Sequence, residues 1–125
     1  MKLPRFPWEG PPLPPRKISD YCYNLAFFIS MAYEEAVKLL YDLTMEREED
    51  AKLRLATLYD IMPQIRGLRF VEESERLEMV KRLGEIDSAL RQGDLVSAHF
   101  NADQLVAGLR GALLDVVVRC EKGRW

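Results

Sequence analysis

Few side chains of this 125-residue chain have the type and spacing for catalysis, and the single histidine comes first. His99 and Asp103 are four residues apart, a spacing that brings two side chains together on one helix face. A nucleophilic triad also needs a serine or cysteine, and neither Ser97 nor Cys120 stands in a recognisable relation to this pair. We therefore expect no catalytic residue and a non-enzymatic protein.

Metal chemistry also lacks its usual residues. Cys22 and Cys120 are the only cysteines, too few for a disulfide scaffold or a structural zinc site. A di-iron bundle needs Glu-x-x-His pairs, but Val96 stands three residues before His99. We expect no metal, no cofactor and two reduced thiols.

Nucleic-acid and nucleotide binding are also disfavoured. The chain has 18 basic and 20 acidic residues and a net charge of −2, whereas nucleic-acid binders usually present a net basic face. Gly108 and Gly111 belong to no phosphate-binding loop, because the lysine of that motif is missing. We expect no nucleic-acid partner.

The N-terminal residues 1–17 form a separate proline-rich segment, and we expect an extended arm there. Six of the seven prolines lie in it: Pro4, Pro7, Pro11, Pro12, Pro14 and Pro15. The spacing of Pro11 and Pro14 also suits the aromatic grooves of proline-binding domains, which makes a protein partner for the arm an alternative.

Two aromatic residues of the arm, Phe6 and Trp8, predict that the arm docks rather than remaining solvated. Gly108 and Gly111 each cost about 0.8–1.0 kcal/mol relative to alanine inside a helix. Close approach of another helix or of the arm would offset that cost. We therefore expect Phe6 and Trp8 to contact the chain near these glycines.

Residues 18–125 are expected to form one all-α domain. Apolar residues recur at steps of three and four, and no stretch alternates with a period of two. The pattern predicts an antiparallel bundle with helices over 20–44, 48–66, 72–91 and 95–121. Its clearest turn contains Gly93, suited to a left-handed conformation, and Asp94, suited to capping the next helix.

One alternative joins the first two helices into a single long bent helix, which gives three. Residues 46–50 contain no apolar side chain, but the apolar stripe resumes in phase after them, and neither glycine nor proline marks a loop. Four helices would place Cys22 and Cys120 at the same end of the bundle. Three helices would separate them by most of a helix length.

The last helix is apolar almost all round between Leu113 and Val118, more than one buried face requires. The first helix is rich in aromatic residues. We predict a homodimeric interaction or adaptor-type protein. Its candidate interface residues are Phe27, Tyr33, Leu114, Val117 and Val118. A protein that binds a small apolar ligand between its helices is the alternative.

The expected location is the cytoplasm. Prolines interrupt the N-terminal segment where a signal peptide needs a continuous apolar helix. The most apolar stretch, residues 25–33, falls well short of the roughly 20 residues that span a bilayer. We expect no membrane association.

Overall fold

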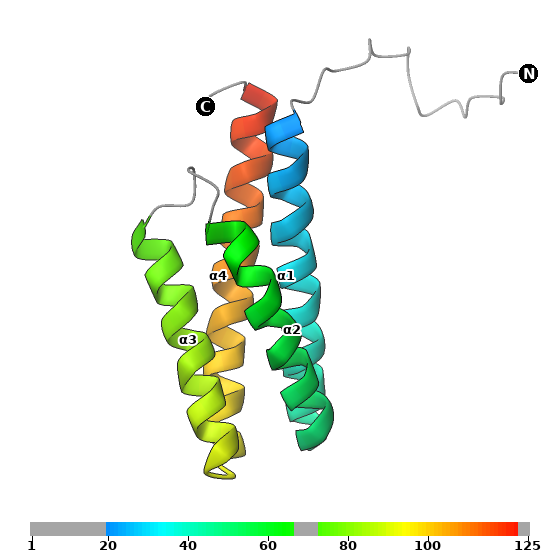
Figure 1. Ribbon diagram of the computed structural model, residues 1–125, viewed down its shortest axis with the longest axis vertical. Coiled ribbons are helices and arrows are strands. Elements are labelled where there is room, and N and C mark those ends of the chain that lie inside the picture. Colours follow the sequence, from blue (N-terminus) through cyan, green and yellow to red (C-terminus); the bar gives the residue numbers. More distant parts are fainter. Residues whose placement is uncertain (1–19, 67–72, 123–125) are drawn as a thin grey trace, which may run out of the picture.

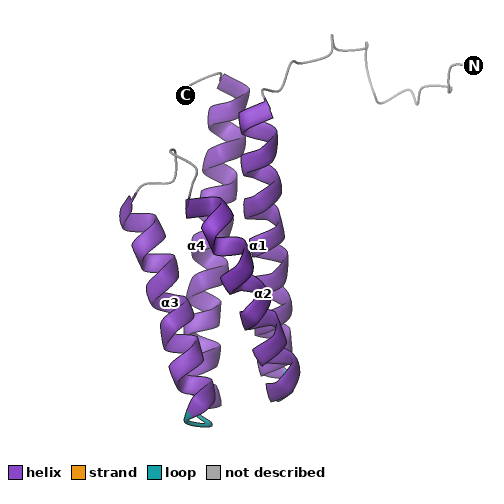
Figure 2. Ribbon diagram, in the orientation of Figure 1, coloured by secondary structure: helices purple, strands orange, loops and turns teal. Residues whose placement is uncertain are grey.

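The computed structural model describes residues 20–66 and 73–122, which form four α-helices and no strand (Figure 2). The helices are α1 (Asp20–Thr44), α2 (Glu48–Arg66), α3 (Glu73–Arg91) and α4 (Leu95–Lys122). The predicted all-α class is confirmed, and each predicted helix boundary agrees within one residue. The predicted arm, residues 1–17, lies outside the described residues.

The four helices lie side by side, with consecutive helices antiparallel (Figure 1). α1 packs against both α2 and α4, and α3 packs against α4, whereas α2 and α3 make far fewer contacts with each other. The largest fully buried side chains come from all four helices: Leu25, Ile29, Leu39, Leu58, Leu83, Ile86, Leu105, Leu109 and Val116. These side chains lie on the inward face of each helix, because burial of one apolar face stabilises the helix.

The α3–α4 turn has the predicted geometry. Gly93 has a φ of 70°, and its amide donates to the carbonyl of Leu90 while the amide of Asp94 donates to that of Ala89. This pair of bonds is a Schellman motif. Asp94 then caps α4, since its Oδ1 accepts a hydrogen bond from the Ser97 amide at 3.1 Å.

The α1–α2 turn has the same hydrogen-bond pattern without a glycine. The amides of Glu46 and Arg47 donate to the carbonyls of Leu43 and Asp42, and Glu46 has a φ of 58°. Residues 20–66 are therefore two helices, and the long-helix alternative is wrong. Glu46 occupies the left-handed position of this turn, the place that Gly93 takes in the α3–α4 turn.

Pro63 lies inside α2, which continues to Arg66. A proline removes one backbone donor and disfavours the helical conformation of the residue before it. Here the helix continues for less than one turn beyond the proline.

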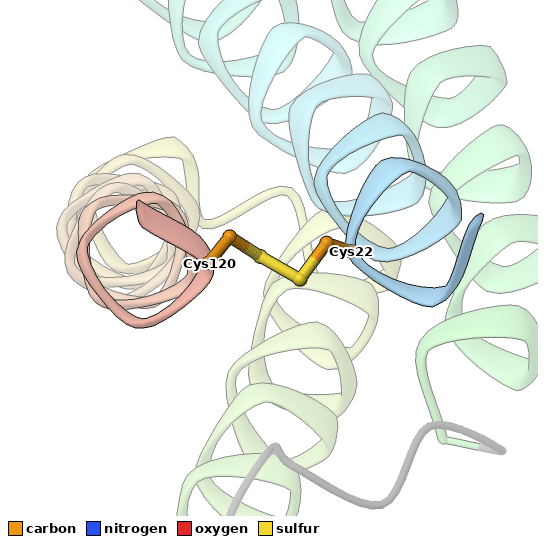
Figure 3. Close-up of a disulfide and its surroundings, with 2 residues drawn as sticks. All are labelled: Cys22 and Cys120. Atoms are coloured by element: carbon orange, nitrogen blue, oxygen red, sulfur yellow. A yellow bond between two sulfur atoms is a disulfide. The ribbon is translucent and has the colours of Figure 1, made fainter. Parts of the chain in front are cut away.

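Cys22 and Cys120 lie at the same end of the bundle, as four helices require (Figure 3). Their Cα atoms are 5.9 Å apart, and the two sulfurs form a disulfide. The expectation of reduced thiols is therefore wrong for this structure. Two cysteines near opposite ends of the sequence meet because α1 and α4 are antiparallel neighbours.

α1 and α4 extend beyond α2 and α3 at the disulfide end (Figure 1). Arg82 Nη1 of α3 donates a hydrogen bond to Asn101 Oδ1 of α4. Because α3 and α4 are antiparallel, the start of α3, nine residues before Arg82, is level with about residue 110 of α4. The last three turns of α4 and the first turns of α1 therefore form a two-helix end. No helix in the described ranges is long and apolar enough to cross a membrane.

Candidate interaction surface

Large apolar side chains are exposed at the two-helix end. On α1, Tyr23 is 63% exposed and Phe27 is 50% exposed. Their rings are stacked with centroids 6.4 Å apart, and Phe27 also meets Phe28 edge-on at 5.6 Å. The four-residue spacing places Tyr23 and Phe27 on one helix face, opposite the buried Leu25 and its stripe.

α4 contributes three more exposed apolar side chains at the same end. Leu114 is 58% exposed, and Val117 and Val118 are each 45% exposed. Val116 between them is buried, so the outward side chains have no place in the bundle core. We call Tyr23, Phe27, Leu114, Val117 and Val118 the apolar end.

Charged groups are scarce around the apolar end. No charged residue occurs between Asp20 and Glu34 of α1. Between residues 111 and 118 of α4 the only charge is Asp115, whose Oδ2 is 3.1 Å from Nε of Arg119. Since this pair is compensated within α4, the surface has little charge to keep it hydrated.

The predicted interface residues divide into two groups. Phe27, Leu114, Val117 and Val118 are exposed, whereas Tyr33 is half-buried and packs against the core. Tyr23 was not among the predicted interface residues, although its spacing from Phe27 was a signal for it. The burial of its neighbour Cys22 decides that Tyr23 points outward.

A groove of about 300 Å³ runs between α3 and α4 and contains the two glycines of α4. Gly108 and Gly111 lie on one side, with Met79, Glu75 and Glu78 among the α3 residues opposite. A Cβ atom at either glycine would meet nothing within 4 Å. The expected close approach of another helix is therefore absent from the described residues. Phe6 and Trp8, the expected arm contacts, lie outside them.

A second groove, of about 410 Å³, lies between α2 and α3. Tyr59 lines it together with Asp87 and Arg91. Burial and then the nearby Asp87 carboxylate raise the pKa of the Tyr59 phenol above its usual 10.0, and Arg91 opposes them. A phenol with a raised pKa stays protonated at neutral pH, so this group supplies no base.

His99 lies at the opposite end of the bundle from the apolar end. Its Nε2 is 3.2 Å from Oγ1 of Thr44, which donates its own proton to the Leu40 carbonyl at 2.8 Å. The contact between His99 Nε2 and Thr44 Oγ1 joins α4 to α1. Cys120 is about 30 Å further along α4 and is held in the disulfide, so it is no nucleophile for His99.

The described residues hold no group of three or more His, Cys, Asp or Glu side chains that could bind a metal ion. The α1 aromatics also line neither groove described above. Among the described residues the apolar end is thus the strongest candidate for an interaction site. Comparison with protein-family models, with curated proteins and with solved structures finds no match to the chain.

Proposed function

We propose that the protein is a non-enzymatic interaction protein that forms a homodimer through the apolar end. The observation that carries this proposal is the exposure of five large apolar side chains where α1 and α4 extend beyond the other helices. Apolar surface of this kind typically marks an interaction site.

A second copy of the chain fits this surface for a physical reason. In a two-fold interface the same patch faces itself, so each side chain is buried twice without any further partner. Apolar patches are self-complementary in this way, whereas a patch of one charge repels itself. Tyr and Phe anchors with few neighbouring charges are also typical of interface centres.

Analytical ultracentrifugation of Leu114→Glu and Val118→Glu tests the proposal. We expect the parent to dimerise at micromolar concentration and both variants to be monomeric with unchanged helical circular dichroism, because the dimer would bury an unpaired charge. Val96→Glu is the matched control: Val96 is 82% exposed on the same helix, but at the far end. That variant should dimerise like the parent.

A monomeric parent, or variants that dimerise as well as the parent does, would contradict the proposed dimer. Native mass spectrometry of the same samples addresses the alternative of a small apolar ligand, which would appear as added mass on the purified protein. A variant lacking residues 1–17 separates the two regions, since loss of dimer on its removal would assign the contact to the arm.

We also propose residues 1–17 as a second contact region, supported by Phe6, Trp8 and the Pro11–Pro14 spacing in the sequence. The proposed location is the cytoplasm. This compartment usually keeps thiols reduced, so the disulfide makes the location testable. Acid quenching of source cells followed by alkylation of the unfolded protein should label both cysteines if the compartment is reducing, and an unlabelled pair would indicate an oxidising one.

A further inference from the structure

We infer that the Cys22–Cys120 disulfide is a redox control of the apolar end: oxidation holds the surface together and reduction releases it. This inference rests on the proposed function, because it assigns regulation to the same surface.

The disulfide sits where the bundle has the least other support. Of the four described helices only α1 and α4 reach this end, because α2 and α3 stop short of it (Figure 1). In the first three turns of α1 the buried apolar side chains are Cys22, Leu25 and Ile29, and in the last three turns of α4 they are Ala112 and Val116. The disulfide therefore adds a covalent link at the end that only two of the four described helices reach.

The cysteines are also immediate neighbours of the apolar end. Tyr23 follows Cys22 in α1, and Val117 lies one helical turn before Cys120 in α4. Helix ends fray when few buried contacts hold them. Separation of the two helix ends would move Tyr23 away from Val117 and Val118, and the surface would lose its shape.

The far end of the α1–α4 pair has its own connection. Thr44 and His99 are hydrogen-bonded there, and the intervals from Cys22 to Thr44 and from His99 to Cys120 agree within one residue. α1 and α4 are thus aligned along their full length. Away from the disulfide end, α2 and α3 also pack against them. Reduction should allow α1 and α4 to separate at the two-helix end and leave the rest of the bundle folded.

A dithiol reductant supplies the two electrons for this reduction. Cys120 is partly exposed and Cys22 is buried, so the reductant's thiolate attacks the sulfur of Cys120 and the Cys22 thiolate leaves. The second thiol of the reductant then displaces Cys120. The reductant ends as a cyclic disulfide, having given two electrons and two protons that leave Cys22 and Cys120 as thiols.

The test compares the full chain in its oxidised form and after treatment with dithiothreitol. We expect the dimer dissociation constant to rise by about tenfold or more on reduction. Hydrogen exchange should become about tenfold faster or more in residues 22–30 and 112–121, and stay unchanged in residues 36–44 and 98–106. Circular dichroism should show that most of the helix remains.

The Cys22→Ser/Cys120→Ser variant is the matched control, since it lacks the cross-link in every buffer. It should match the reduced parent and show no response to dithiothreitol. An oxidised dimer that keeps its dissociation constant on reduction would overturn this inference and leave the proposed function standing. Unchanged hydrogen exchange at the two-helix end, or general unfolding on reduction, would also overturn it. A monomeric oxidised protein would overturn the proposed function and this control together.

Discussion

At the scale of single residues, Glu46 and Gly93 occupy equivalent places in two turns with the same hydrogen bonds. Both have a positive φ, 58° for Glu46 and 70° for Gly93. The left-handed conformation costs a residue with a side chain about 1–2 kcal/mol, because Cβ crowds the following carbonyl oxygen. Glycine has no Cβ, so only the turn at Glu46 carries this cost.

Exchanging the residue types at these two positions should therefore have opposite effects on stability. Glu46→Gly should raise the free energy of unfolding by about 0.5–1 kcal/mol, the strain removed less the greater entropy of an unfolded glycine. Gly93→Ala should lower it by about 1–2 kcal/mol. Urea denaturation measures both.

Gly84→Ala is the control for these two variants. Gly84 lies inside α3 with open space around its Cα, so alanine there should stabilise the protein by about 1 kcal/mol through helix propensity. If Gly93→Ala stabilises the protein as Gly84→Ala does, the left-handed strain at the turn is not what distinguishes the two positions.

Asp94 makes stability depend on pH in the acid range. Its hydrogen bond from the Ser97 amide lowers the pKa of its carboxyl below the usual 3.8. A carboxyl with a lowered pKa in the folded state stabilises the protein fully above its unfolded pKa. That contribution is lost as the pH falls through the folded pKa.

Asp94→Asn keeps a capping oxygen and removes the titration. The melting temperature of the variant should fall less steeply than that of the parent as the pH drops below about 4. Thermal unfolding followed by circular dichroism between pH 2 and 7 gives both curves. Parallel curves for the two proteins would show that the cap does not contribute to the acid dependence.

At the scale of helix pairs, α1 and α2 are joined by a half-buried ion-pair cluster. Arg54 of α2 reaches Glu35 Oε2 at 3.4 Å and Asp42 Oδ2 at 3.6 Å. Asp42 is only 6% exposed, and its Oδ2 accepts no hydrogen bond within the described residues. Arg54 is therefore the charge that offsets the burial of this carboxylate.

Removal of Arg54 should leave Asp42 buried without a counter-charge. Arg54→Leu should lower the free energy of unfolding by about 1–3 kcal/mol, and the added change Asp42→Ala should recover much of the loss. Lys52→Leu is the control on the same helix, because its pair with Glu49 is exposed and should contribute less than about 1 kcal/mol. If Arg54→Leu and Lys52→Leu lower the free energy of unfolding equally, the burial of the Asp42 carboxylate is not the cause of the loss.

At the scale of the whole molecule, α1 and α4 are the central pair and also the two longest helices. α2 is attached through α1 and α3 through α4, while the seam between α2 and α3 stays open enough for a groove of about 410 Å³. The molecule thus has one compact four-helix part and one two-helix end. The proposed dimer would cover the part of α1 and α4 that no other described helix covers.

The all-α class, the ranges of α3 and α4 and the turn at Gly93 and Asp94 could be predicted from the sequence, whereas it left open whether residues 20–66 form one helix or two. These features are local: apolar spacing repeats within a few residues, and a glycine or a capping aspartate acts on its own turn. The surplus of apolar residues around Leu114 and Val118 was also visible, because one buried helix face needs fewer of them.

The residues that meet across the bundle could not be predicted in this way, because their contacts join distant parts of the chain. A glutamate in a left-handed turn carries no sequence signal, so the break at Glu46 depends on α2 folding back onto α1. The disulfide needs the antiparallel alignment of α1 and α4, which brings Cys22 and Cys120 together from opposite ends of the sequence. The exposure of Tyr23 and the half-burial of Tyr33 depend on which face of α1 packs against the other helices. Relative helix lengths and contacts between distant segments set these features, and periodicity along one helix does not contain that information.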